Sequence, residues 1–167
     1  PTYSETRSMV WQSVAAGANG IVFYEYADLL RNPDVSFVDA FGNLKSIAAE
    51  LAKHAPVLLS DAGKAPSPVV ASGDAGHDWL MTRAQWSDDK SQLYVLFVVS
   101  DGSGNGTVAF EFGDRAKFGC KTTLSVVRIM EFDPRAAVHA PQPQVNGCAF
   151  SDNVPLKAAA AYQVSFE

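Results

Sequence analysis

Four residues near the N-terminus place aromatic rings next to carboxylates: Tyr24, Glu25, Tyr26 and Asp28. Two carboxylates can serve as the acid and the base of a hydrolytic reaction when they lie about 5–10 Å apart, on opposite sides of the bond. Glu25 and Asp28 are close neighbours at the end of one predicted strand, a placement that rarely gives this geometry. We therefore do not expect them to form a catalytic pair.

A Gly-rich stretch, Asp101 to Gly106 (DGSGNG), has the opening of a calcium-binding loop. Oxygen-bearing side chains stand at its first, third and fifth positions, and Gly stands at the sixth. The twelfth position should be a Glu that clamps the ion, but it is Phe112, and Glu111 points to the other face of the predicted strand. We expect a hairpin connection here and no metal site.

Two cysteines, Cys120 and Cys148, are the next candidates for chemistry. A disulfide between them would close a loop of about 29 residues and stabilise the protein by roughly 3–4 kcal/mol through chain entropy. Two separate buried thiols are equally compatible with the sequence, and no Cys-x-x-Cys spacing indicates a metal or redox site. The cysteines therefore do not identify the cellular compartment of the protein. Secretion of the parent protein is one option.

Composition and charge argue against several classes of protein. Of the 167 residues, 47% are hydrophobic and 19% are charged, which is typical of a folded domain. The net charge is -5 and the 13 Lys and Arg residues are scattered, so we expect no nucleic-acid partner. The longest apolar run, Leu93 to Val99, is far short of the ~20 residues that span a bilayer, so we expect no membrane partner. The sequence has no phosphate-binding loop, and we expect no cofactor.

A helix and a strand are expected to position the aromatic run. Thr2 and Glu5 have capping-box spacing, which predicts a helix start, and Gly17 is expected to end that helix. Residues 21–26 (IVFYEY) do not alternate, which predicts a parallel strand covered on both faces. The expected buried face of the helix consists of Thr6, Met9, Val10, Ser13, Val14 and Gly17.

A second helical pattern runs from Phe37 to Leu51. Gly42-Asn43 can split it into a short turn and a main helix, and Pro56 is expected to stop it. His54, at the predicted C-terminus, is interpreted as a helix-end residue whose positive charge is favourable there, and not as a ligand.

The Gly- and Pro-rich stretch 62–68 (AGKAPSP) separates two predicted domains, residues 1–60 and residues 61–167. Beyond it, short strands separated by turn residues indicate an antiparallel sandwich of about seven or eight strands. The stretch 92–100 is apolar on both faces and is expected to be a central strand. The predicted strands are 79–86, 92–100, 107–112, 122–132 and 160–166. The expected fold class is therefore α+β.

The predicted strand 21–26 has no partner in this chain. A buried parallel strand needs neighbours at both edges, and no other βα unit is encoded here. The sequence also begins at Pro1, without a signal-peptide pattern, which we interpret as a cut. We therefore expect a missing N-terminal segment, or a second chain, to pair with residues 21–26.

The opening stretch PTYSETRSMVWQSVAAGANGIVFYEYADL resembles the last turn of a (β/α)8 glycoside hydrolase. In that pattern PT-x-x-E-x-R-x-M opens the seventh helix, Q-x-x-x-x-GA-x-GI closes it, and an aromatic eighth strand follows. Residues 44–60 (LKSIAAELAKHAPVLLS) are similar to the eighth helix and its exit. Two later stretches, WLMTRAQWSDDKSQLYVLFVVS and FSDNVPLKAAAAYQVSF, are similar to strands of the β-sandwich that often follows such barrels, where an Asp, a Pro and a late Tyr recur.

The resemblance implies a fold and a function. The chain would be the end of a TIM barrel followed by a β-sandwich, within an enzyme that cleaves the glycosidic bonds of a carbohydrate substrate. Both catalytic carboxylates would lie upstream, so no catalytic residue is assigned here and this chain alone would be inactive. Tyr24, Glu25 and Tyr26 would bind substrate, because (β/α)8 enzymes place substrate groups at the C-terminal ends of their strands. The alternative is a non-catalytic β-sandwich module for carbohydrate binding or interaction.

Overall fold

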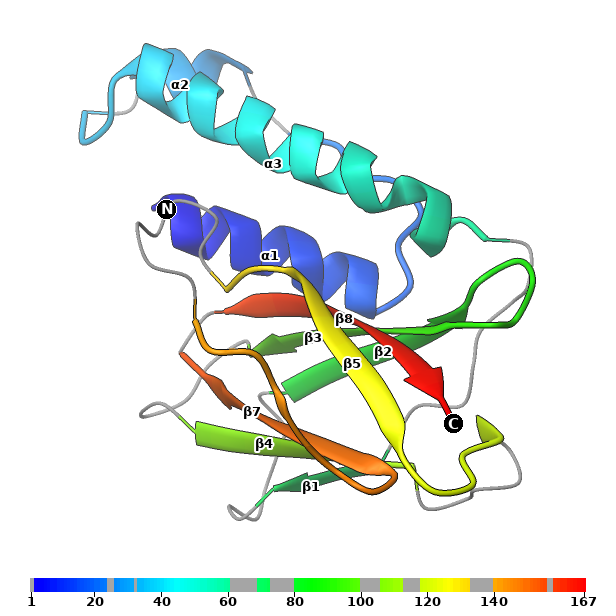
Figure 1. Ribbon diagram of the computed structural model, residues 1–167. Coiled ribbons are helices and arrows are strands. Elements are labelled where there is room, and N and C mark those ends of the chain that lie inside the picture. The colour runs from blue at the N-terminus through cyan, green and yellow to red at the C-terminus, as the bar shows by residue number, and fades with distance from the viewer. Residues whose placement is uncertain are drawn as a thin grey trace.

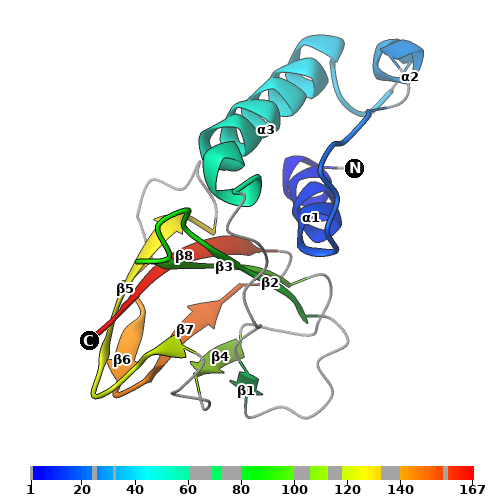
Figure 2. The same cartoon turned by 90° about the vertical axis from the view of Figure 1, so that its right-hand side faces the viewer.

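The elements of the computed structural model form three layers (Figure 1). A layer of helices covers one face of a four-stranded antiparallel sheet, the inner sheet, whose strand order is β2-β3-β8-β5 (Figure 2). A second four-stranded antiparallel sheet, the outer sheet, has the order β1-β4-β7-β6 and packs on the other face. The structure describes residues 2–23, 26–31, 33–60, 69–72, 80–99, 106–112, 118–132, 140–155 and 158–167.

The helices are α1 (Tyr3–Ala15), α2 (Tyr26–Arg31) and α3 (Phe37–Leu58). The strands of the inner sheet are β2 (Leu80–Trp86), β3 (Leu93–Val99), β5 (Leu124–Met130) and β8 (Ala159–Phe166). Those of the outer sheet are β1 (Val69–Ser72), β4 (Gly106–Glu111), β6 (Gln144–Asn146) and β7 (Ala149–Val154). The chain is thus an α+β structure with antiparallel sheets. Within the described ranges, no helix combines the length and apolar character needed to cross a membrane.

Helix α1 begins and ends where its sequence predicts. The Thr2 hydroxyl accepts from the Glu5 amide at 3.3 Å, and the Glu5 carboxylate accepts from the Thr2 amide at 2.9 Å, which completes the capping box. Gly17 takes a φ of 106° just beyond the helix, a conformation that costs glycine little. The buried face differs from the expected one, because it consists of Arg7, Ser8, Val10, Trp11 and Val14, while Met9 is exposed.

The predicted strand at 21–26 is wrong for the residues that the structure describes. Ile21, Val22 and Phe23 belong to no strand, and Tyr26 is the first residue of α2. A strand exists only where its amides and carbonyls pair with a neighbour, and residues 21–23 pair with no strand of either sheet. Val22 is 90% exposed despite its apolar side chain. Residues 21–23 are apolar, but the described parts of this chain do not supply the pairing that would make them a strand.

Helix α3 is longer and more continuous than the sequence indicates. Ser36 caps it, its hydroxyl accepting from the Asp39 amide at 3.2 Å. The helix passes through Gly42 without a break, and it passes through Pro56 to end at Leu58. A proline so close to a helix end removes a single intrahelical hydrogen bond, a loss that tertiary packing of the last turns can offset.

The predicted strands 79–86, 92–100, 107–112, 122–132 and 160–166 correspond to β2, β3, β4, β5 and β8. As expected, β3 is central, between β2 and β8. Strands β1, β6 and β7 were not predicted. The first two are only four and three residues long, too short for alternation to show. The third pairs with β4 and carries the buried polar residue Asp152, which hides its core-facing pattern.

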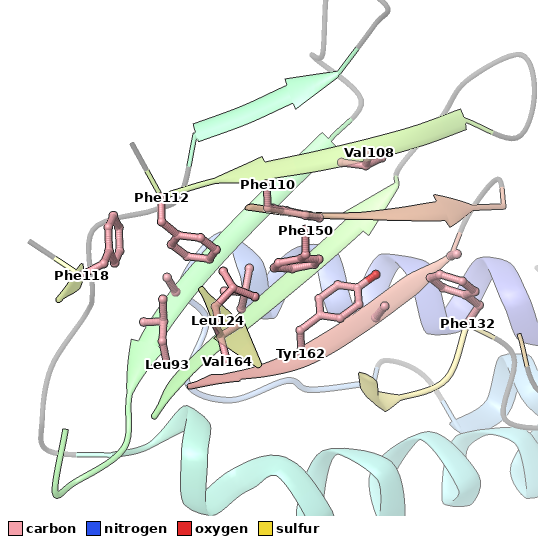
Figure 3. Close-up of a cluster of buried hydrophobic side chains, with 14 residues drawn as sticks. Leu93, Val108, Phe110, Phe112, Phe118, Leu124, Phe132, Phe150, Tyr162 and Val164 are labelled. Atoms are coloured by element: carbon pink, nitrogen blue, oxygen red, sulfur yellow. The ribbon is translucent and has the colours of Figure 1, made fainter. Parts of the chain in front are cut away.

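Two apolar clusters hold the three layers together. The first lies between the sheets, where the rings of Phe110 and Phe150 stack with centroids 4.8 Å apart and both contact Tyr162 (Figure 3). The second lies between the helices and the inner sheet and includes the buried side chains of Trp11 and Leu96. The inner sheet is covered on both faces, which explains why the sequence of its central strand β3 lacks polar alternation.

Of the two alternatives for the cysteines, the structure has the bonded one. Cys120 and Cys148 form a disulfide with their Cα atoms 6.1 Å apart. Cys120 precedes β5 of the inner sheet, and Cys148 lies in the turn between β6 and β7 of the outer sheet. The bond therefore cross-links the two sheets through residues 28 positions apart in the sequence.

We expect reduction of this disulfide to lower the free energy of unfolding by roughly 3–4 kcal/mol, because the cross-link restricts the unfolded chain. Urea unfolding with and without a reductant measures the effect. The double variant Cys120→Ser/Cys148→Ser is the control, and its unfolding should not respond to the reductant. Alkylation of two thiols in the denatured, unreduced protein would show that the bond is absent.

Candidate functional site

The predicted substrate-binding residues are not tested by the structure. Tyr24 and Glu25 lie outside the described residues, and Tyr26 and Asp28 are described only as backbone within α2. The calcium-like stretch 101–106 is described only at Gly106, where β4 begins. Among the residues with described side chains, no group of three or more His, Cys, Asp or Glu could hold a metal ion. The binding role of Tyr24, Glu25 and Tyr26 stays a prediction.

The junction between the helices and the inner sheet contains a buried ionic cluster. Arg7 on α1 donates from Nε and Nη2 to the two carboxylate oxygens of Glu50 on α3, at 2.8 and 2.7 Å. It also donates to Phe132 O at 2.8 Å and to Glu131 O at 2.9 Å, just beyond β5. Trp11 Nε1 donates to the Glu50 carboxylate at 3.2 Å. Glu50 is therefore held by three donors and is poorly placed to act as an acid or a base.

A second arginine reaches across the junction in the opposite direction. Arg83 on β2 donates from Nη1 to Val14 O and from Nη2 to Leu58 O, both at 3.1 Å. These carbonyls belong to the last turns of α1 and α3, and neither helix has a basic residue in its last turn. A cation at a helix C-terminus offsets the partial negative charge of the terminal carbonyls. One side chain of the sheet thereby fixes both helix ends.

His54 is buried in the same junction, where its ring lies edge-on to that of Trp11 with centroids 5.9 Å apart. The prediction that it is a positively charged helix-end residue is wrong, because α3 continues for another turn to Leu58. Burial lowers the pKa of His54, and the charge of Lys53 lowers it further, while Glu50 raises it. The imidazole is therefore neutral at neutral pH.

We expect the protein to lose stability as the pH falls below 6.5, the ordinary pKa of histidine. The unfolded chain protonates His54 near that value, whereas the folded chain does so only at lower pH, so acid favours unfolding. The test is the urea midpoint between pH 7.5 and pH 5 for the wild type and for His54→Gln. The variant should lose less stability over this range, and an identical pH dependence in both proteins would refute the role of His54.

A second ionic cluster lies between the two sheets. Arg128 on β5 donates from Nε to Asp152 Oδ2 on β7 at 3.0 Å, and the Tyr162 hydroxyl on β8 donates to the same oxygen at 2.8 Å. Arg128 also donates to Ala140 O and Pro141 O. Burial and the charge of Asp152 raise the pKa of Tyr162, so the phenol stays protonated. Because its groups satisfy one another, this cluster joins the sheets and offers no free catalytic group.

The helical layer exposes an unusual number of large apolar side chains. Val22 is 90% exposed, Val38 is 77% exposed and Leu30 is 58% exposed. Figure 2 shows that α2 and the N-terminal part of α3 project beyond the inner sheet. Exposed apolar residues mark a site of interaction with another protein segment where they form a contiguous patch. We call this set the exposed helical surface, and its members are Met9, Val22, Phe23, Leu30, Val38 and Phe41.

Sequence reasoning missed the two arginines of the junction, although a signal for one of them is present. Arg7 stands three, four and seven residues before Val10, Trp11 and Val14, on the same helical face. A charged residue on an apolar helical stripe indicates a buried ion pair. No comparable signal exists for Arg83, whose acceptors are backbone carbonyls of other elements.

Comparisons with known proteins add little to these observations. The chain matches no family model, and it matches no curated protein. Among solved structures, it is similar to a GH30 endoxylanase from Clostridium papyrosolvens, with 12% sequence identity and a TM-score of 0.37. The match covers 58% of this chain and 22% of the endoxylanase chain. A TM-score this low does not establish a shared fold, so the proposals below rest on the residues of the chain itself.

Proposed function

We propose that this chain is the C-terminal part of a (β/α)8 glycoside hydrolase, in which a β-sandwich supports the end of the barrel. The observation that carries the proposal is the exposed helical surface, which leaves Val22 and Val38 largely in water. Burying a side chain of this kind stabilises a structure by about 1.5–3 kcal/mol, and this stabilisation is absent while the side chain stays in water. The proposed occupant of this surface is the remainder of the barrel.

The order of the elements supports the same proposal. An apolar, unpaired segment at residues 21–23 lies between α1 and α3 in sequence, as a barrel strand lies between two barrel helices. Both helices also pack on the inner sheet through the cluster around Trp11, and the Arg7–Glu50 pair joins the two helices to each other. A parallel strand on each side of residues 21–23 would supply the strand pairing that these described residues lack. In that assembly the segment becomes the strand that the sequence predicts.

In the proposed enzyme, this chain and the remainder of the barrel would have different roles in the chemistry. The resemblance to (β/α)8 glycoside hydrolases implies that the carboxylates that cleave the glycosidic bond would come from the remainder of the barrel. In this chain, Glu50 and Asp152 are held by arginines. Tyr24, Glu25 and Tyr26 would contribute to binding a carbohydrate. A tyrosine ring can stack on a sugar face, and a carboxylate can accept hydrogen bonds from sugar hydroxyls.

Native mass spectrometry of the purified protein, followed by a denaturing mass measurement, tests the proposal. We expect the 17.9 kDa chain to travel with a polypeptide of roughly 200–300 residues, the size that completes a barrel, and the complex to hydrolyse a glycoside. The double variant Val22→Asp/Val38→Asp should lose the partner while remaining folded. Val127→Asp, which changes an exposed valine of β5, is the matched control and should keep it.

A chain that appears alone, or as a dimer of itself, would contradict the barrel proposal. Binding of an oligosaccharide by such a chain, without hydrolysis, would support the alternative of a non-catalytic carbohydrate-binding sandwich. Loss of the partner in both variants would mean that the exposed helical surface is not the contact.

A further inference from the structure

The cover that the helices give to the inner sheet ends near β5, the edge strand of that sheet. Along β8, Tyr162 and Val164 belong to the core between the sheets, whereas Ala161 belongs to the cluster beneath the helices. Gln163, the next residue on the helix side, is only half-buried. Val127, which pairs with Gln163 from β5, is 52% exposed. From this row onwards the helix-side face of the sheet is open to solvent.

The strand register determines which side chains share the open part of this face. Tyr94 of β3 pairs with Gln163 of β8, and Gln163 pairs with Val127 of β5, so the three side chains form a row across the sheet. Two positions further along the strands, Ser165 of β8 pairs with Ser125 of β5 and points to the same face. We call this set the Tyr94 face, and its members are Gln92, Tyr94, Ser125, Val127, Gln163 and Ser165.

The Tyr94 face is polar but neutral. None of its residues is charged, whereas phosphorylated and acidic ligands are held by Arg or Lys. The amide of Gln163 and the hydroxyls of Ser125 and Ser165 have no hydrogen-bond partner among the residues that the structure describes. Amides and hydroxyls both donate and accept hydrogen bonds. The face therefore suits an uncharged ligand that carries many hydroxyl groups.

The ring of Tyr94 lies along its strand. Its hydroxyl donates to Gln92 Oε1 at 3.2 Å, and Gln92 stands two positions earlier on the same face of the sheet. A tyrosine ring that leans along the sheet in this way offers a flat apolar surface beside the free amide and hydroxyls. A flat apolar surface next to polar groups matches a sugar ring, whose C–H groups form an apolar side and whose hydroxyls lie around its rim.

We propose that the Tyr94 face binds a neutral oligosaccharide, with one sugar ring stacked on Tyr94 and sugar hydroxyls bonded to Gln163, Ser125 and Ser165. From the usual strand spacings, the face extends roughly 10 Å across the strands and roughly 7 Å along them. That area suits a short stretch of a linear sugar chain. A protein partner needs about 800 Å² on each side, far more than these residues offer.

This binding is independent of the barrel proposal, because it requires neither a second polypeptide nor hydrolysis. The test is a titration of the whole ¹⁵N-labelled chain, followed by its amide spectrum, with cellohexaose, mannohexaose, xylohexaose and maltohexaose up to the millimolar range. We expect at least one of these neutral probes to give saturable shifts centred on Tyr94, Ser125 and Gln163. Hexagalacturonate, which is negatively charged, should bind more weakly than that probe.

Two variants assign the binding to the face. Tyr94→Ala should weaken it about tenfold or more, as for the aromatic centre of a binding site, whereas Tyr94→Phe keeps the ring and should retain most of the affinity. Gln163→Leu, which keeps the size of the side chain but removes its amide, should weaken binding about fivefold. Phe41→Ala is the matched control, because it removes a 39% exposed ring from α3, and it should have no effect.

The amide spectrum of each variant also reports whether it is folded, and Gln163→Leu provides the test if Tyr94→Ala does not fold. Failure of the folded wild type to bind any neutral probe would overturn the proposal, as would tighter binding of hexagalacturonate. Binding that the folded variants at positions 94 and 163 leave unchanged would also overturn it. Shifts confined to residues 24–26 would place the sugar at the predicted substrate residues instead.

Discussion

Asp152→Ala is expected to lower the free energy of unfolding by about 3–5 kcal/mol, the cost of removing one partner from a buried ion pair. The Arg128 side chain is 0% exposed and that of Asp152 is 6% exposed, so water cannot replace the missing carboxylate. The substitution also leaves the Tyr162 hydroxyl without the acceptor at 2.8 Å. Because these residues come from both sheets, the loss should appear as cooperative unfolding of the whole sandwich, measured by urea denaturation.

Two comparisons make this prediction specific. Glu111→Ala removes an exposed carboxylate from β4 of the outer sheet and should change stability by less than about 0.5 kcal/mol. The double variant Arg128→Met/Asp152→Leu removes both charges and should be much less destabilised than Asp152→Ala, because no unpaired buried charge remains. A single variant as stable as the Glu111 control would show that the pair contributes nothing.

Arg7→Met is expected to cost about 3 kcal/mol or more, again because it leaves a buried partner charge. The side chains of Arg7 and Glu50 are 4% and 12% exposed, and Arg7 also satisfies two carbonyls beyond β5. The loss of stability should be larger at the junction between the helices and the inner sheet than within the sandwich. Amide hydrogen exchange should therefore accelerate in α1 and α3 more than in β4 and β7.

The control for Arg7→Met is Arg31→Met, which removes an exposed arginine from the end of α2 and should leave stability within about 0.5 kcal/mol. A double-mutant cycle with Glu50→Leu isolates the pairwise energy, which should exceed about 0.5 kcal/mol because the two side chains are in direct contact. Uniform acceleration of exchange in all elements would show that the helices and the sandwich unfold as one unit.

These pairs bear on the proposed function. A sandwich that supports the end of a barrel must hold the last barrel helices in a fixed orientation. Arg7 reaches from α1 to the exit of β5, and Arg83 reaches from β2 to the ends of α1 and α3. The helices are thereby held from both sides while their other surface stays exposed. Whatever binds the exposed helical surface would meet a preorganised layer.

The start of α1, its glycine end and the central position of β3 could all be predicted from the sequence. The Thr2–Glu5 capping box and the turn at Gly17 involve residues that are near one another in the chain. The two-sided apolar character of β3 reflects a sheet that is covered on both faces. Each of these features depends on local hydrogen bonds or on residue type, so each can be recognised in the sequence itself.

The tertiary structure decided the features that depend on a distant partner. Residues 21–23 have the composition of a buried strand but belong to no strand, and Val22 and Phe23 are exposed, since strand formation requires neighbours that composition cannot supply. The choice between a disulfide and two thiols required two cysteines 28 positions apart to meet. The partners of Arg7 lie 43 or more positions away. Local chemistry thus determined where elements begin and end, whereas the pairing of charges, cysteines and strands was decided by packing, because only the folded chain brings distant residues within contact distance.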